Sequence, residues 1–134
     1  MKVAGIHHVA MAVDDLDEAI AMYERLFGAE LECRGVLAEQ GVEAAYVRVG
    51  TGRVELVASI AEDSPVARFL ARRGPGMHHL ALAVADVTSA ARELTKEGAS
   101  VIGGEARSGL GGHEVSFIHP ESVHGVLVEV VADE

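Results

Sequence analysis

The apolar and polar positions at the start of the chain predict a strand followed by a helix. Residues 6–13 alternate, are rich in Val, Ala and Met, and end at Asp14 and Asp15, where a carboxylate can cap a helix. From Leu16 onward the apolar residues follow helical spacing, and Gly28 ends the pattern. The apolar stripe of this predicted helix consists of Leu16, Ala19, Ile20, Tyr23 and Phe27.

The pattern then changes to short extended segments separated by glycines. These predicted strands lie near 30–38, 42–49 and 53–59. With the preceding strand and helix they predict a βαβββ unit. A short connecting helix is predicted at 64–73, because Ser64 can cap it and Pro65 occupies its first position.

The second half of the chain predicts the same order of elements. A strand at 77–84 precedes a helix from about 86 to 97, which Gly98 ends. Further strands are predicted near 100–103, 113–118 and 124–131. The glycine-rich stretch 103–112 is predicted to be a loop, and the strand–loop–helix order of a phosphate-binding motif is missing there.

The two halves also repeat in sequence. Ile-His-His-Val-Ala-Met-Ala-Val at 6–13 returns as Met-His-His-Leu-Ala-Leu-Ala-Val at 77–84, an offset of 79 − 8 = 71. Asp15 matches Asp86 at the same offset. Such self-similarity indicates two copies of one supersecondary unit. It predicts an α+β fold of two paired βαβββ modules.

Composition narrows the classes of function. The chain has 134 residues, of which 49% are apolar, too dispersed for a membrane span. The net charge of −10 argues against a nucleic-acid partner, since phosphate binding needs a basic surface. The single Cys33 excludes an internal disulfide, and no signal-peptide pattern opens the sequence, so we expect a cytoplasmic protein.

Each module begins with a histidine pair, His7-His8 and His78-His79. Successive side chains of a strand point to opposite faces, so only one member of each pair can face a shared site. The repeat itself does not say which. A lone histidine is usually a core or surface residue, but two matched histidines in a duplicated unit favour a metal site between the halves.

Two carboxylates extend this pattern. Glu55 and Glu129 each interrupt the apolar last strand of a module, at a similar offset of 129 − 55 = 74. A solvent-facing glutamate on an antiparallel sheet is the alternative, but a buried one needs a partner or a metal. Two histidines and two glutamates suit Co, Ni, Mn, Fe or Zn as divalent ions. Two open positions of an octahedral ion could then bind substrate oxygens and stabilise developing negative charge.

The chain resembles the vicinal oxygen chelate (glyoxalase/bleomycin resistance/dioxygenase) superfamily and, within it, the methylmalonyl-CoA epimerase family. The resemblance covers essentially the whole chain. The matching segments are Ile-His-His-Val-Ala at 6–10, Glu-Gln-Gly-Val at 39–42, Glu-Asp-Ser-Pro-Val-Ala-Arg-Phe-Leu at 62–70, Gly-Met-His-His at 76–79, Phe-Ile-His-Pro-Glu at 117–121 and Gly-Val-Leu-Val-Glu at 125–129.

The resemblance implies a single domain over 1–134 in which the modules form a cupped mixed sheet around a metal. The modules would span about 4–60 and 76–132, with the connecting helix at about 64–73. The implied ligands are the second histidine of each pair and both glutamates: His8, Glu55, His79 and Glu129. Co²⁺ is the favoured ion, with Ni²⁺, Mn²⁺ or Zn²⁺ as alternatives, and a homodimer is expected.

The implied reaction interconverts the (R) and (S) epimers of methylmalonyl-CoA, a CoA thioester, through an enolate. Glu129 is implicated as one acid/base. The family position of the second falls on Ala44, so Glu43 is only a tentative candidate, and a one-residue shift would turn it to the other face. Glu39 and His113 are further candidates. The alternatives are a glyoxalase I-like enzyme acting on a thiol adduct, a metal-free binding protein and an oxygen-activating relative. Glu55 as a fourth ligand argues against the last, which uses two histidines and one carboxylate.

Overall fold

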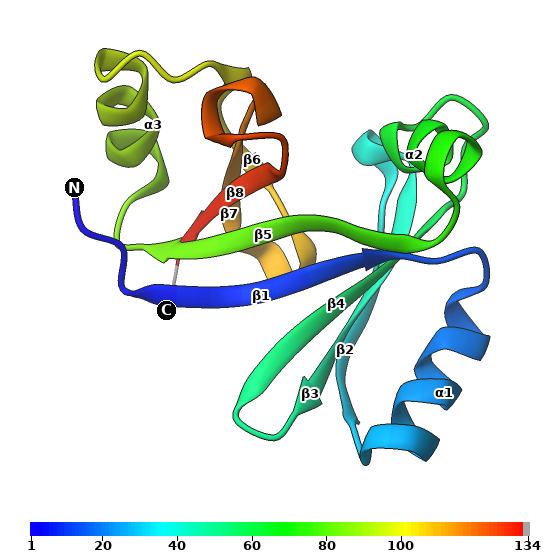
Figure 1. The fold of residues 1–134 in the computed structure, drawn as a ribbon. Coiled ribbons are helices and arrows are strands. Elements are labelled where there is room, and N and C mark those ends of the chain that lie inside the picture. Colours follow the sequence, from blue (N-terminus) through cyan, green and yellow to red (C-terminus); the bar gives the residue numbers. More distant parts are fainter. Residues whose placement is uncertain (133–134) are drawn as a thin grey trace. The chain divides into compact units, whose positions relative to one another are not determined.

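The computed structural model describes residues 1–132, except the side chains of residues 104 and 105, and it contains two compact units (Figure 1). One unit is His8–His78. The other joins Met1–His7 to the described residues from His79 onward. None of the helices in the described part of the chain has the length and apolar character needed to span a membrane.

The unit His8–His78 has the predicted βαβββ order followed by the connecting helix. Its elements are β1 (Gly5–Ala12, which enters the unit at His8), α1 (Leu16–Phe27), β2 (Glu30–Leu37), β3 (Val42–Val49), β4 (Gly52–Ser59) and α2 (Pro65–Arg73). A short 3₁₀ turn, Ala38–Gln40, joins β2 to β3. The strand order is β2-β3-β4-β1, with β1 parallel to β4 and the other pairs antiparallel.

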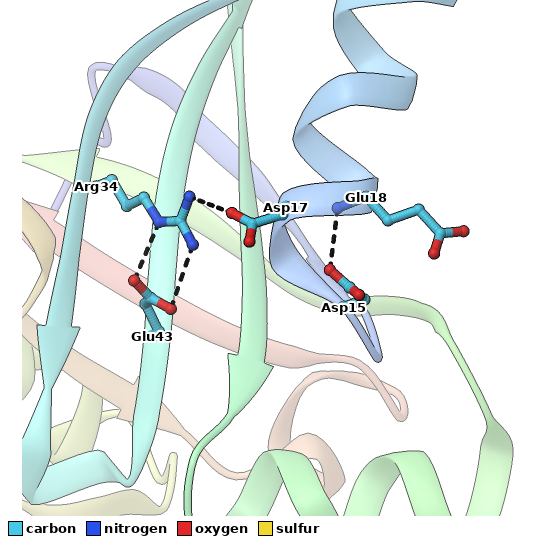
Figure 2. A network of polar contacts seen from close by, with 5 residues as sticks. All are labelled: Asp15, Asp17, Glu18, Arg34 and Glu43. Carbon is cyan, nitrogen blue, oxygen red and sulfur yellow. Dashed lines mark hydrogen bonds and ion pairs between the residues drawn. The ribbon is translucent and has the colours of Figure 1, made fainter.

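The helix ends follow the capping residues in the sequence. The Asp15 carboxylate accepts a hydrogen bond of 3.0 Å from the backbone N–H of Glu18 (Figure 2). Gly28 ends α1 in the left-handed conformation. The Ser64 hydroxyl accepts the N–H of Ala67 at the start of α2. These three predicted boundaries are confirmed.

The second unit repeats the arrangement. Its elements are β5 (Gly76–Val84, which enters the unit at His79), α3 (Val87–Lys96), β6 (Val101–Ser108), β7 (Glu114–Ile118) and β8 (Leu127–Ala132). The strand order is β5-β8-β7-β6, with β5 parallel to β8. Each unit therefore has a mixed sheet, and the α+β class and βαβββ order are confirmed. The single domain over 1–134 stays a prediction, and its last two residues lie outside the described ones.

Two predicted boundaries in this unit are wrong. The stretch 103–112 is not all loop, because β6 continues to Ser108 and a 3₁₀ turn follows at Leu110–Gly112. The strand pairs with β7 on both sides of the glycines, and the register of this pairing shifts between Ile102 and Arg107. The last strand begins at Leu127 rather than 124, because a 3₁₀ turn ends at His124 with a positive φ of 64°.

In each sheet, one face packs against a helix. In the unit His8–His78, α1 covers a core that includes Ala45 and Val47 of β3 and Leu56 and Ala58 of β4. In the other unit, Val87 and Ala90 of α3 pack with Ile118, Val128 and Val130. Side chains alternate along each strand. The face of each sheet that points away from its helix therefore carries one histidine and one glutamate: His8 and Glu55 in the first unit, His79 and Glu129 in the second.

Candidate metal centre

The register of β1 and β4 brings His8 and Glu55 together. Ala10 lies beside Glu55 in the parallel ladder, and His8 precedes Ala10 by two residues on the same face. Nε2 of His8 is 3.5 Å from Oε1 of Glu55. Both residues are buried, with His8 1% and Glu55 6% exposed.

The other unit builds the same pair. Ala81 lies beside Glu129 in the parallel ladder of β5 and β8, and His79 precedes Ala81 by two residues. Nε2 of His79 is 3.6 Å from Oε2 of Glu129, and both residues are buried. The repeat in sequence therefore produces the same His–Glu arrangement in both units, with an alanine beside each glutamate in the ladder.

The chemistry of these donors fits a divalent ion. A carboxylate in an apolar strand is costly to bury unless it is paired, hydrogen-bonded or bound to metal. The N···O separations of 3.5 and 3.6 Å exceed a normal hydrogen bond. Donor atoms that share one ion at bond lengths of about 2.1 Å lie roughly 3.0 to 3.5 Å apart. The His8–Glu55 separation is at the upper end of this range and the His79–Glu129 separation is just beyond it, so each pair is close to the spacing of two ligands of one ion.

The first histidine of each repeat has different neighbours. The ring of His7 contacts His113 edge-on, with centroids 5.6 Å apart. The ring of His78 contacts Phe69 of α2 in the same manner at 5.0 Å. By strand alternation each lies on the face opposite to the histidine that follows it.

Glu43 faces away from the His8–Glu55 pair. It lies across from Ala58, a member of the core under α1, whereas Tyr46 lies across from Glu55. Its carboxylate accepts hydrogen bonds from Arg34, which also donates to Asp17 of α1 (Figure 2). The geometry therefore gives the tentative assignment of Glu43 as an acid/base no support. Because a single residue reverses the face of a strand, the buried Ala44 lies on the Tyr46 side instead.

Two aromatic residues beside the pairs were missed from the sequence. The ring of Tyr46 is 5.2 Å from that of His8, and the ring of Phe117 is 5.6 Å from that of His79. The signal was present, because 117 − 46 = 71 is the offset of the histidines. The match is obscured in the sequence because one position holds Tyr and the other Phe.

A charged cluster adjoins Tyr46. The guanidinium of Arg53 lies 5.1 Å from the centre of the Tyr46 ring and donates a hydrogen bond of 2.9 Å to Glu32. Glu32 also accepts one from Arg48, which lies directly across from Arg53. The hydrogen bond from Arg53, together with Arg48, holds the pKa of Glu32 below its ordinary value despite opposition from burial. A bulge between Leu31 and Cys33 leaves Glu32 outside the regular register of β2 and β3, at the place where it accepts hydrogen bonds from both arginines.

The sequence also matches a known protein family. Residues 7–117 match the Glyoxalase/Bleomycin resistance protein/Dioxygenase superfamily. The chain belongs to this superfamily. Among its members, the human protein named methylmalonyl-CoA epimerase, mitochondrial, is 36% identical over 126 residues, which cover 93% of this chain and 72% of the human protein.

Solved structures of superfamily members are similar over nearly the whole chain. The crystal structure of methylmalonyl-CoA epimerase from Mycobacterium tuberculosis has a TM-score of 0.94 and 36% identity, and the match covers 98% of this chain and 89% of that one. A methylmalonyl-CoA epimerase in complex with methylmalonyl-CoA and NH4+ has a TM-score of 0.94 and 34% identity, with 98% and 96% covered. At this identity and coverage the relationship extends beyond a shared fold.

Proposed function

We propose that the chain is an epimerase that interconverts the (R) and (S) forms of methylmalonyl-CoA. The observation that carries the proposal is the pair of buried His–Glu contacts, repeated with the same register in both units. Relatives named methylmalonyl-CoA epimerase support the choice of substrate, and one of them is solved with methylmalonyl-CoA bound.

In this proposal His8, Glu55, His79 and Glu129 together hold one divalent ion. Two imidazole nitrogens and two carboxylate oxygens are compatible with Co²⁺, which we favour over Ni²⁺, Mn²⁺ and Zn²⁺. When bound, the ion would act as a Lewis acid that stabilises negative charge on the substrate oxygens. The two buried carboxylates offset the charge of the ion, and the apolar strands around them limit access of water.

Proton transfer is the second task of these residues. The C2 hydrogen of methylmalonyl-CoA lies between a thioester and a carboxylate, so its removal gives an enolate. We assign the removal to the Glu129 carboxylate, which takes the proton as the C2–H electron pair moves toward the thioester oxygen. Inversion requires that a proton return to C2 from the opposite side. Glu43 lies on the face toward α1 and is bonded to Arg34, so that proton comes from another group.

The remaining expectations concern the setting of the enzyme. We propose a homodimer in the cytoplasm, with the CoA thioester as its small-molecule partner. The reducing cytoplasm agrees with the single Cys33. The human relative is named mitochondrial. Mass measurement of the purified protein by light scattering tests the dimer, and imaging of a tagged chain in its native cell tests the location.

Hydrogen exchange at C2 tests the function directly. We expect the protein with Co²⁺ to exchange the C2 hydrogen of methylmalonyl-CoA for deuterium in heavy water and to invert the centre. A chelator should abolish both, and added Co²⁺ should restore them. Turnover of a glutathione hemithioacetal without C2 exchange would instead establish the glyoxalase I-like alternative. Exchange that persists in the metal-free protein would contradict metal dependence.

A further inference from the structure

The two His–Glu pairs are each part of a larger arrangement that includes an aromatic ring. Tyr46 lies directly across from Glu55 in the antiparallel ladder of β3 and β4. Phe117 lies directly across from Glu129 in the ladder of β7 and β8. Each unit therefore places a histidine, a glutamate and an aromatic residue on one face of three adjacent strands.

The aromatic ring contacts the imidazole in both units. The rings of Tyr46 and His8 are tilted by 58° with centroids 5.2 Å apart. Those of Phe117 and His79 are nearly perpendicular, at 89° and 5.6 Å. Tilted and edge-to-face geometries at these distances are the favourable ones for aromatic pairs. A ring held in this way restricts rotation of the imidazole about its side-chain bonds.

The aromatic rings are themselves held, by different means in the two units. Tyr46 is 5% exposed and contacts the Arg53 guanidinium, which Glu32 fixes through a hydrogen bond. Phe117 instead packs against the apolar side chains of Ala81, Val115 and Val131. Each imidazole thus rests on a ring with limited freedom of its own.

We propose that Tyr46 and Phe117 are positioning residues, whose rings fix the imidazole orientations of His8 and His79 for metal binding. The inference rests on the proposed metal site. Binding requires Nε2 of each histidine to point at the ion, and an imidazole already aimed there loses less freedom when the ion arrives. The hydroxyl of Tyr46 is not needed for this role, because Phe117 fulfils it without one.

The role is tested with Co²⁺ as the probe. Leucine variants, Tyr46→Leu and Phe117→Leu, remove the flat ring but keep an apolar side chain, whereas Tyr46→Phe keeps the ring. Phe69→Leu is the matched control, because Phe69 makes the same kind of contact with His78, the first histidine of its pair, which is not a proposed ligand. Dissociation constants come from Co²⁺ titration, the visible absorption of bound Co²⁺ reports ligand geometry, and circular dichroism confirms folding.

We expect each site leucine variant to bind Co²⁺ about 10-fold more weakly, within the roughly 10–100-fold range for groups that orient metal ligands. Its absorption bands should also change. Tyr46→Phe and Phe69→Leu should match the wild type within about twofold. Should a leucine variant fail to fold, the methionine variant at that position replaces it. Folded leucine variants with wild-type affinity and absorption would overturn the positioning role alone, whereas a wild-type protein that binds no Co²⁺ would overturn the metal site and this inference with it.

Discussion

Nε of Arg34 donates a hydrogen bond of 3.0 Å to the carboxylate of Glu43, on the face of β3 that packs toward α1. Arg34 also donates to Asp17 of α1 at 2.6 Å. The hydrogen bond with Glu43, and to a lesser degree the one with Asp17, raises the pKa of Arg34 above its ordinary value. The guanidinium therefore keeps its charge. Glu43 therefore has a structural partner on the face opposite to His8 and Glu55.

Glu43→Gln should consequently leave catalysis intact. We expect C2 exchange and inversion to stay within about twofold of wild type for both epimers, because the side chain has no access to the metal face. Each epimer is followed separately in heavy water. Glu55→Gln on the opposite face of the neighbouring strand is the matched control, and it should bind Co²⁺ more weakly because a neutral amide replaces an anionic ligand. If Glu43→Gln exchanged one epimer without inverting it, Glu43 would be the second acid/base after all.

Replacement of the two buried glutamates should separate metal binding from proton transfer. Glu55→Ala and Glu129→Ala each remove one anionic ligand, so both should weaken Co²⁺ binding by at least about 10-fold. With Co²⁺ in excess, Glu55→Ala should recover exchange. Glu129→Ala should not, because it also lacks the group that takes the C2 proton. Full recovery of both variants would leave Glu129 as a ligand only.

Glu32 should make stability depend on pH in the acid range. Its pKa is lowered in the folded protein, so its contribution is fully present above the unfolded pKa of about 4.3 and is lost as the pH falls through the folded value. Glu32→Gln should be less stable than wild type at pH 7, by under about 1 kcal/mol as for exposed ion pairs. Urea unfolding from neutral to acid pH should show the difference shrinking below about pH 4. A difference that grew on acidification would contradict this sign.

Two glycines of similar conformation should respond differently to alanine. Gly28 and Gly41 both have positive φ angles, 64° and 68°. A Cβ at Gly28 meets nothing within 4 Å, whereas one at Gly41 would lie 3.0 Å from Cβ of Ala61 and 3.1 Å from Cβ of Ser64. Gly28→Ala should therefore cost only the backbone term of about 1–2 kcal/mol. Gly41→Ala should cost clearly more, as measured by urea unfolding, and equal losses would mean that the segment around Ser64 yields freely.

Local signals in the sequence predicted most of the elements. Asp15 and Gly28 mark the ends of one helix, and Ser64 with Pro65 marks the start of another, because caps act through hydrogen bonds to adjacent residues. The extent of β6 could not be predicted in this way. Its glycines are typical of a loop. The segment is extended because it pairs with β7, and that pairing joins residues that are separated along the sequence.

The two His–Glu contacts of the candidate site were predictable because they are repeated. Both halves carry the same residue types, histidine and glutamate, at the matched positions. Each His–Glu contact then follows from the strand register. The aromatic neighbours share the repeat but differ in residue type, so they became evident only from the ring contacts. The partner of Glu43 was hidden for another reason, since nothing local connects Arg34 to it before β2 and β3 pair.

The connections between strands show where the two copies have been free to diverge. Tyr46 and Glu55 are nine residues apart and Phe117 and Glu129 are twelve apart, since 55 − 46 = 9 and 129 − 117 = 12. The connection between β7 and β8 (119–126), which contains the turn Pro120–Val123, is longer than that between β3 and β4 (50–51), and shorter strand segments offset part of this difference. The two copies therefore differ in the length of this connection but keep the aromatic residue directly across from the glutamate. An engineer who wished to graft a new recognition loop onto this protein would find the natural precedent between Ile118 and Leu127.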